Sequence, residues 1–189
     1  MKHIAITGAN GTIGRIIQTQ LAWDTKVEHY QSGNINPDNI QMTFNTYRAA
    51  FETGVPRVIM ASSVHADDFE GWHAPPYLSS DRIPTPDSPY GASKVFMEAL
   101  GRYYAKKGLE VVCVRFMGLN TLNKSSENTE DQRRWFSHRD CGNLMKAIIE
   151  APSVPQNYVL MYGVSHNSNR KHDYANPFGW IPVDNAGGA

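Results

Sequence analysis

The sequence lacks several features that would mark a specialised class of protein. Only two of its 189 residues are cysteines, Cys113 and Cys141, too few for a disulfide framework. No run of about 18 apolar residues occurs, which argues against a membrane-spanning helix. The 18 basic and 18 acidic side chains balance, which argues against a nucleic-acid partner. The first residues are too quickly polar for a signal peptide, so we expect a cytoplasmic protein with neither a nucleic-acid nor a membrane partner.

The sequence does contain short apolar stretches that alternate with helical patterns, without internal repeats. We expect strands at residues 3–7, 25–31, 57–62, 111–115 and 158–162, and helices at 13–21, 38–53, 90–107 and 139–150. Gly108 is expected to end the third helix and Ser137 to cap the fourth, while Cys113 is expected to be a buried thiol. Such an alternation indicates a parallel sheet covered on both faces.

Three glycines stand between the first expected strand and the first expected helix, in the stretch Thr7-Gly8-Ala9-Asn10-Gly11-Thr12-Ile13-Gly14. Gly8 permits a tight turn, Gly11 has no Cβ to block a pyrophosphate, and Gly14 lets the helix pack close to the strand. The N–H groups at the start of the helix attract phosphate. Three glycines at this spacing exceed what a simple turn requires, so the stretch predicts a dinucleotide-binding loop.

A tyrosine and a lysine four residues apart open the third expected helix. Tyr90 and Lys94 share one helix face, so the ammonium is expected to stabilise the phenolate and lower the pKa of Tyr90. Ser63 ends an apolar strand, at the edge where open parallel sheets place their active sites, and would bond the reacting oxygen. The tyrosine–lysine spacing alone occurs by chance in many helices. Its position after a glycine loop and a Ser-Ser strand end predicts a proton-transfer site.

Together these motifs resemble the extended short-chain dehydrogenases/reductases, the NAD-dependent epimerase/dehydratase family. The resemblance implies an α/β, Rossmann-like three-layer fold with a mostly parallel sheet, and NAD as the cofactor. It implies catalytic roles for Ser63, Tyr90 and Lys94, with Lys94 also holding the nicotinamide ribose. The segment 39–45 is similar to the family's helix with an active-site asparagine, here Asn39, although a surface polar group is the alternative. The implied cofactor contacts are Gly8, Asn10, Gly11, Thr12, Ile13, Gly14, Gln31, Tyr90 and Lys94.

Within this family the sequence looks most like uronate dehydrogenases, which oxidise an aldohexuronic acid to its lactone with NAD. The similar segments are 62–65, 114–118, 133–140 and 162–165. Val64 replaces the asparagine usual in that group, while His65 keeps the next position. The resemblance implies substrate contacts from Ser63 and His65, and a carboxylate clamp from Arg133 or Arg134. For residues 137–140 we favour a plain helix start, with Ser137 as the cap and His138 in solvent.

The sequence departs from the family between the first two expected helices. Only residues 22–37 fill an interval in which the family carries three strands and two helices, so the sheet should be reduced in strand number. Gln31 stands roughly where an acidic residue usually binds the adenosine ribose. Residues 4–7 must then pair directly with 58–61 or leave strand edges to another chain. The chain also ends soon after residues 179–182, before the family's usual C-terminal helical region.

The sequence leaves three functions open. The protein is an oxidoreductase that oxidises a sugar or uronic acid with NAD, a related epimerase or dehydratase that uses the same triad, or a degenerate, non-catalytic nucleotide-binding or interaction protein. No arginine follows the second expected strand to bind a 2′-phosphate, which favours NAD over NADP. We expect no metal site and one domain, residues 1–189, with substrate-side loops at 63–88 and 120–136. The resemblance to the family also implies a homodimer formed through the helix 90–107 and its neighbour.

Overall fold

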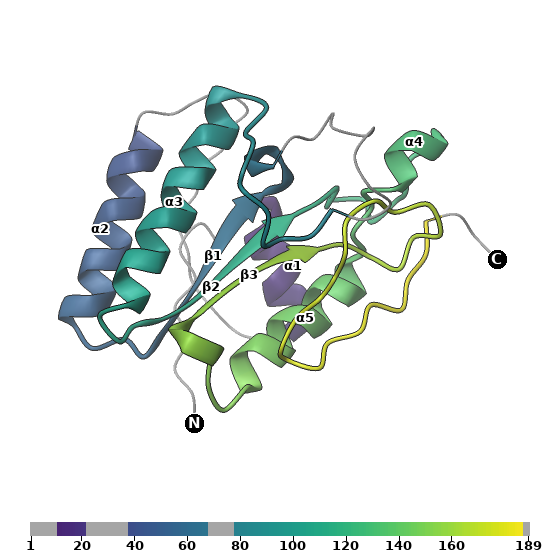
Figure 1. Ribbon diagram of the computed structural model, residues 1–189. Coiled ribbons are helices and arrows are strands. Elements are labelled where there is room, and N and C mark those ends of the chain that lie inside the picture. Colours follow the sequence, from purple (N-terminus) through teal and green to yellow (C-terminus); the bar gives the residue numbers. More distant parts are fainter. Residues whose placement is uncertain (1–10, 22–37, 68–77, 187–189) are drawn as a thin grey trace.

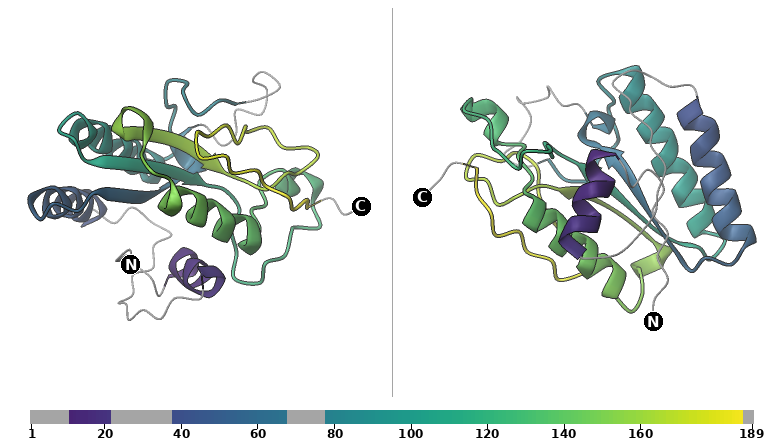
Figure 2. Two further views of the ribbon diagram at one scale, coloured as in Figure 1. Left: turned by 90° about the horizontal axis from the view of Figure 1, so that it is seen from below. Right: turned by 180° about the vertical axis from the view of Figure 1, so that it is seen from behind.

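The computed structural model describes residues 11–21, 38–67 and 78–186, in which a parallel sheet lies between two layers of helices (Figure 1). Its three strands are β1 (Arg57–Ser63), β2 (Glu110–Phe116) and β3 (Tyr158–Gly163), in the order β1-β2-β3. Helices α2 (Asp38–Glu52) and α3 (Pro89–Ala105) pack on one face, and α1 (Thr12–Leu21) and α5 (His138–Glu150) on the other (Figure 2). The predicted Rossmann-like α/β fold with few strands is confirmed.

The helix ends follow the capping residues that the sequence predicts. The side chain of Ser137 accepts a hydrogen bond from Asp140 N at the start of α5. After α3, Gly108 has a φ of +101° and donates to Ala105 O, while Leu109 N donates to Tyr104 O. This pair of bonds is the Schellman motif, for which glycine is the preferred residue. Both cap predictions are confirmed.

The predicted strands and helices that fall on the described residues are confirmed, with ends that differ by at most two residues. Regular structure also occurs where loops were expected, in the short helices η1 (Val64–Ala66) and α4 (Thr129–Gln132); a further short helix, η2 (Pro155–Asn157), precedes β3. Asn128 caps α4, whose first turn carries acidic side chains that suit a helix N-terminus. The strands expected at 3–7 and 25–31, and the pairing of residues 4–7, lie outside the described residues.

The central strand β2 separates two apolar cores. Val112, Val114 and Phe116 face the core on the side of α1 and α5, whereas Val111 and Cys113 face the core beneath α2 and α3. Cys113 and Cys141 are buried free thiols, and burial raises the pKa of each to about 12. The prediction that Cys113 is a buried thiol is therefore confirmed. Among the described ranges, no helix combines the length and apolarity needed to cross a membrane.

Candidate active site

The predicted proton-transfer residues meet where β1 ends and α3 begins. Ser63 is the last residue of β1, and its side chain lies close enough to that of Tyr90, in the first turn of α3, to lower the pKa of the phenol. One turn later, the Lys94 ammonium donates to Ala61 O at 2.9 Å and lies 5.4 Å from the centre of the Tyr90 ring. The structure thus brings together the phenol, the hydroxyl and the cation that the sequence singled out.

A close approach of η1 to α3 holds this arrangement. A Cβ on Gly91 would lie only 1.9 Å from His65 O, so no residue other than glycine fits there without a backbone shift. Asp87 N donates to the same carbonyl oxygen at 3.3 Å, and His65 N donates to Ser63 Oγ at 3.3 Å. The glycine that follows Tyr90 therefore allows the first turn of α3 to lie against the end of β1.

The pKa values at this site are shifted chiefly by burial. Burial raises the pKa of Tyr90 above its ordinary value, and the hydrogen bond with Ser63 only partly offsets this effect. Burial lowers the pKa of Lys94, while Cys113 and Glu98 act in the opposite direction. The expected lowering of the Tyr90 pKa by Lys94 is not found, because the ammonium is directed to the Ala61 carbonyl and burial dominates at the phenol.

His65, for which a role in substrate binding remains a prediction, lies beside Tyr90. The two rings meet edge to face with centroids 5.8 Å apart, and the imidazole side chain is 40% exposed. His65 Nδ1 is 2.9 Å from an Asp87 carboxylate oxygen, which favours a proton on Nδ1. The described residues include no group of three or more His, Cys, Asp or Glu side chains that could hold a metal ion.

The described half of the glycine loop fits a phosphate group. Arg15 N donates to Gly11 O at 3.0 Å, so the N–H groups of Thr12, Ile13 and Gly14 have no acceptor within α1. The first turn carries no acidic side chain that would repel an anion from the positive end of the helix dipole. Gly8, Asn10 and Gln31 lie outside the described residues, and Asn39 is half-buried in the first turn of α2.

The two arginines expected to clamp a carboxylate are bonded within their own helical turn. Arg133 pairs with Glu130, and Arg134 with Asp131. Arg134 O also accepts a hydrogen bond from Gly118 N at 2.7 Å, which ties this segment to the chain that leaves β2. A role in substrate binding remains a prediction for both arginines.

The expectation that His138 lies in solvent is wrong. Its Nε2 atom is 2.7 Å from Asn120 O, and its backbone N–H donates to Asn123 Oδ1, so the half-buried ring helps to close the loop before α4. The physical reason is that the loop folds back over the start of α5. The sequence alone does not predict this contact.

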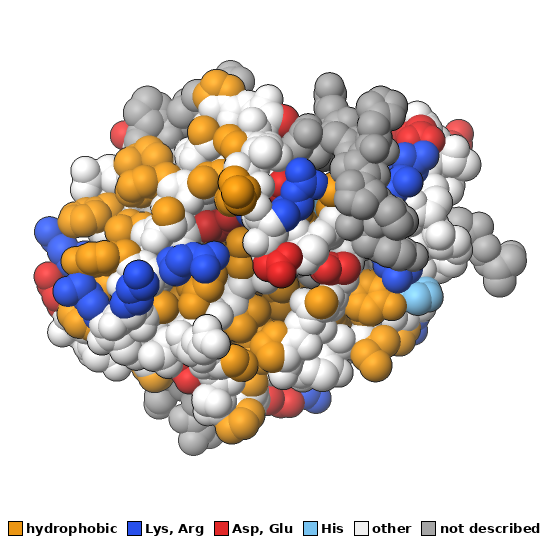
Figure 3. Space-filling model, viewed as in Figure 1, with side chains coloured by type: hydrophobic (Ala, Val, Ile, Leu, Met, Phe, Trp, Pro, Cys, Tyr) orange, Lys and Arg blue, Asp and Glu red, His pale blue; other side chains and the backbone are white. Residues whose placement is uncertain are grey.

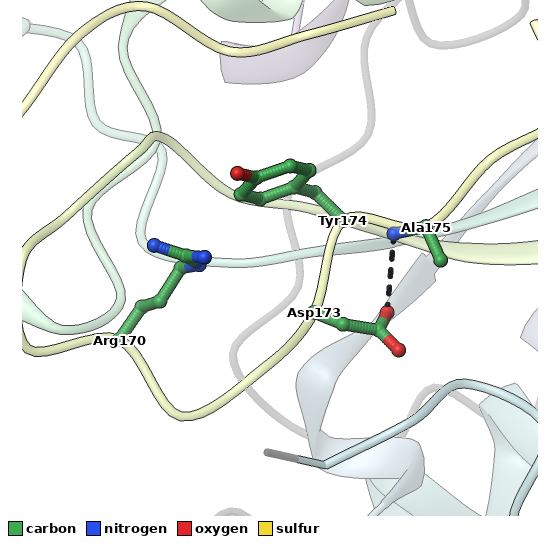
Figure 4. A pocket seen from close by; sticks show the side chains of 4 residues that line it. All are labelled: Arg170, Asp173, Tyr174 and Ala175. Carbon is green, nitrogen blue, oxygen red and sulfur yellow. Dashed lines mark hydrogen bonds between the residues drawn. The ribbon is translucent and has the colours of Figure 1, made fainter. Parts of the chain in front are cut away.

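A shallow hollow of about 360 Å³ opens on the loop that follows β3 (Figure 4). It is lined by Arg170, Asp173, Tyr174 and Ala175, with the Arg170 guanidinium 4.5 Å from the centre of the Tyr174 ring. Asp173 N donates to Leu78 O, so this loop packs against the expected substrate-side loop. These residues belong to no periodic segment or motif, so the sequence alone does not predict them.

A buried ionic cluster beneath Ser63 was also missed. The Arg115 guanidinium binds both oxygens of Glu98, at 2.9 and 2.8 Å, and reaches Asp67 at 3.2 Å. Two signals pointed to it. Arg115 is a charge inside the apolar run 111–116, and Glu98 stands four residues after Lys94 on the same helix face.

Comparison with known proteins places these features in context. The sequence profile of the NAD dependent epimerase/dehydratase family matches residues 24–138. The L-arabinose 1-dehydrogenase (NAD(P)(+)) of Haloferax volcanii is 29% identical over 250 aligned positions, which cover 98% of each chain. Because 250 positions exceed the 189 residues by 61, the alignment spans stretches that this chain lacks, as an internal deletion requires.

The uronate dehydrogenase of Agrobacterium fabrum is 34% identical over 151 residues, 78% of this chain and 54% of that protein. This chain thus spans only about half the length of the uronate dehydrogenases that it matches, and 61% of the NAD-dependent glucose-6-phosphate dehydrogenase of Haloferax volcanii. Among solved structures, a mutant uronate dehydrogenase from Agrobacterium tumefaciens complexed with NAD has a TM-score of 0.80 and 27% identity, over 96% of this chain and 84% of that one.

Proposed function

Because the chain belongs to the NAD-dependent epimerase/dehydratase family, we propose that it is an oxidoreductase that oxidises a sugar or a uronic acid with NAD. The observation that carries the proposal is the meeting of Ser63, Tyr90 and Lys94 at the end of β1. A phenol, a hydroxyl and a cation that lie close together are the groups that proton transfer from an alcohol requires. The names of the relatives, L-arabinose 1-dehydrogenase and uronate dehydrogenase, supply the substrate class.

The described residues fit NAD through their donor chemistry. The N–H groups of Thr12, Ile13 and Gly14 at the start of α1 suit a pyrophosphate, and Lys94 suits a ribose hydroxyl. We assign the remaining contacts, Gly8, Asn10, Gly11 and Gln31, to the same cofactor by the family resemblance. When bound, NAD supplies the two-electron oxidant that side chains cannot provide.

In the proposed mechanism Tyr90 accepts the proton of the sugar hydroxyl that is oxidised. Ser63 hydrogen-bonds the same oxygen and holds it next to the phenol, and Asn39 supports the site from the first turn of α2. Because burial raises the pKa of Tyr90, the phenolate forms only toward alkaline pH. The kcat/KM for sugar oxidation therefore rises with pH over the neutral-to-alkaline range.

We assign recognition of the substrate to residues around this phenol. His65 lies beside Tyr90 and contacts a sugar hydroxyl, and Arg133 or Arg134 binds the carboxylate when the substrate is a uronic acid. An arginine that binds substrate must exchange its partner in α4, Glu130 or Asp131, for the substrate carboxylate. These assignments distinguish uronic acids, which present a carboxylate, from neutral aldoses.

We further propose a cytoplasmic homodimer built from a single domain, residues 1–189. Hydrophobic side chains gather over α2 and α3 in the space-filling view (Figure 3). Those at least one-third exposed on these helices are Ile40, Met42, Phe44, Phe51 and Tyr103. An apolar surface of this kind is stabilised when a second copy covers it. The two buried free thiols are consistent with a reducing compartment.

The proposed function is tested by titrating NAD into the purified chain and following thermal unfolding, then adding uronic acids and aldoses. NAD at 100 times its Kd stabilises the fold by about 2.7 kcal/mol, and we expect NADH to appear with at least one sugar. Conversion of a sugar to its epimer without release of NADH would instead support an epimerase. A cooperative unfolding transition that millimolar NAD does not shift would support a non-catalytic protein.

A further inference from the structure

A row of polar side chains crosses the sheet one residue before the strands end. Ser62, Arg115 and Tyr162 are cross-strand partners on β1, β2 and β3. All three are at most 3% exposed. They share one face of the sheet, since residues directly opposite one another in neighbouring strands point the same way. Polar groups in such a place need partners from the layer above, and α3 supplies one.

That partner is Glu98, which is only 3% exposed. Its Oε1 atom accepts hydrogen bonds from Ser62 Oγ at 2.6 Å and from Arg115 Nε at 2.9 Å, and its Oε2 atom accepts from Arg115 Nη2 at 2.8 Å. A carboxylate buried this deeply persists only because an opposite charge and hydrogen bonds occupy its oxygens. Glu98 therefore binds the ends of β1 and β2 to one point on α3.

Glu98 also belongs to the helix face that carries the proposed catalytic groups. It follows Lys94 by four residues, as Lys94 follows Tyr90, so the three side chains stand in one line along α3. At the other end, Ser62 directly precedes Ser63, whose side chain lies next to that of Tyr90. The Ser62–Glu98 bond and the contact between Ser63 and Tyr90 thus link the same two elements, β1 and α3, at adjacent residues.

The far end of the row, at Tyr162, contacts a different segment, the one that follows η1. The Tyr162 hydroxyl donates to Asp67, which also receives Arg115 Nη1 at 3.2 Å. Asp67 pairs with Arg82 and accepts a hydrogen bond from Thr85, so this end holds the segment after η1 against the sheet. No bond of this end involves Ser62 or Ser63.

We propose that Glu98 is a positioning residue for the site: by holding Ser62, it fixes the neighbouring Ser63 against Tyr90. The inference rests on the proposed oxidation of a sugar at Ser63, Tyr90 and Lys94. Arg115 orients the Glu98 carboxylate through two hydrogen bonds, whereas the bonds between Asp67 and Tyr162 stabilise the fold without aligning the proposed catalytic groups.

The test compares Ser62→Ala with Tyr162→Phe, each of which removes one buried hydroxyl. Ser62→Ala deletes the bond to Glu98 and leaves the ion pair between Glu98 and Arg115 intact. Tyr162→Phe deletes the bonds of the Tyr162 hydroxyl to Asp67 and to Arg115 Nη1, and leaves both bonds between Arg115 and Glu98 in place. For Ser62→Ala we expect kcat to fall about tenfold with little change in KM. The reason is that the alignment of Ser63 with Tyr90 stabilises the transition state more than it stabilises the bound substrate. Ser62→Thr restores the hydroxyl and most of kcat, and Tyr162→Phe keeps the wild-type kcat.

A second readout does not depend on turnover. In chain labelled with ¹³C at tyrosine Cζ, with the Tyr90 signal assigned from Tyr90→Phe, Ser62→Ala shifts that signal and Tyr162→Phe does not. Ser62→Cys, which keeps the volume and weakens the donor, replaces the alanine variant if the latter does not fold. An unchanged kcat and Tyr90 signal in the Ser62 variants, or equal changes in Tyr162→Phe, would overturn the proposal. If the wild type oxidises no sugar, the proposed function fails, and the Tyr90 signal alone decides the positioning role.

Discussion

At the scale of single residues, His172 is a neutral imidazole inside the protein. It is 1% exposed, its ring lies edge-on to Tyr162 with centroids 4.6 Å apart, and neither ring nitrogen has a hydrogen-bond partner among the described residues. Burial lowers the pKa of His172 to about 4, with Arg115 and Arg82 acting in the same direction and Asp67 opposing them. Protonating this ring within the fold is therefore unfavourable.

This environment predicts a loss of stability in acid. The unfolded chain binds a proton at His172 near pH 6.5, whereas the folded chain does so only near pH 4, so the free energy of unfolding falls as the pH decreases through this range. The contribution of His172 is up to about 3 kcal/mol. His172→Phe keeps the ring contact with Tyr162 and should remove this part of the pH dependence. Urea unfolding of both proteins between these pH values measures it, and an equal loss in both would contradict the prediction.

At this scale the sequence predicted the proximity of those residues whose spacing alone brings them together. Tyr90 and Lys94 share a helix face whether or not that face is buried. Ser63 ends a strand at the edge of the sheet where this helix begins. The direction of the Tyr90 pKa shift was not predictable, because it depends on burial and on the orientation of Lys94. Glu98 and Arg115 were missed for a related reason, since their bond joins a helix to a strand.

At the scale of elements, the exposed apolar face of α2 and α3 leads to a prediction about the proposed homodimer. Met42 is 46% exposed on α2, and Leu122 is 74% exposed on the loop after β2. If two copies pair through α2 and α3, light scattering will give a mass of twice 21.1 kDa. Met42→Lys places a charge in that interface and should shift the mass toward one chain, while Leu122→Lys should not.

A wild-type mass of one chain would contradict the proposed homodimer. A wild-type dimer that both lysine variants leave intact would place the interface on another face. Thermal unfolding of the two variants serves as the control for folding, since both substitutions are made at exposed positions.

The elements with a capping residue and a long apolar pattern were predicted to within two residues. α5 is an example, because Ser137 fixes its start and its buried face recurs with helical spacing. α4 was missed because four polar residues carry no such pattern, and it depends on the cap at Asn128. The partial burial of His138 was missed because its partner, Asn120, lies 18 residues away in the sequence, on a loop that folds back over the start of α5.

At the scale of the whole molecule, the described residues keep the three-layer arrangement of the fold with a sheet of only three strands. The described sheet has β2 at its centre and helices on both faces, and α1 still packs directly on α5. A Cβ on Gly142 in α5 would lie 2.4 Å from Gln20 Cβ in α1, so this glycine allows the close contact between the two helices. The start of α1, which is expected to bind phosphate, is therefore held by packing that does not require the stretches absent from this chain.

The reduced sheet was predictable from the short interval between the first two helices, since 16 residues cannot form three strands and two helices. How residues 4–7 pair is not decided by the sequence, because direct pairing with 58–61 and pairing with another chain both satisfy the strand edges. The substrate is likewise not decided by the motifs, since Ser63, Tyr90 and Lys94 act on any suitably placed hydroxyl.

The central claim is that Tyr90 is the base in an NAD-dependent oxidation of a sugar or uronic acid. The rate of NADH formation by Tyr90→Phe, compared with the wild type on the same sugar, tests it most directly. We predict a fall in kcat of at least about 10²-fold, because phenylalanine keeps the ring packing and removes the group that accepts the proton. The thermal midpoint should change little. A folded variant that turns over at the wild-type rate would contradict the account.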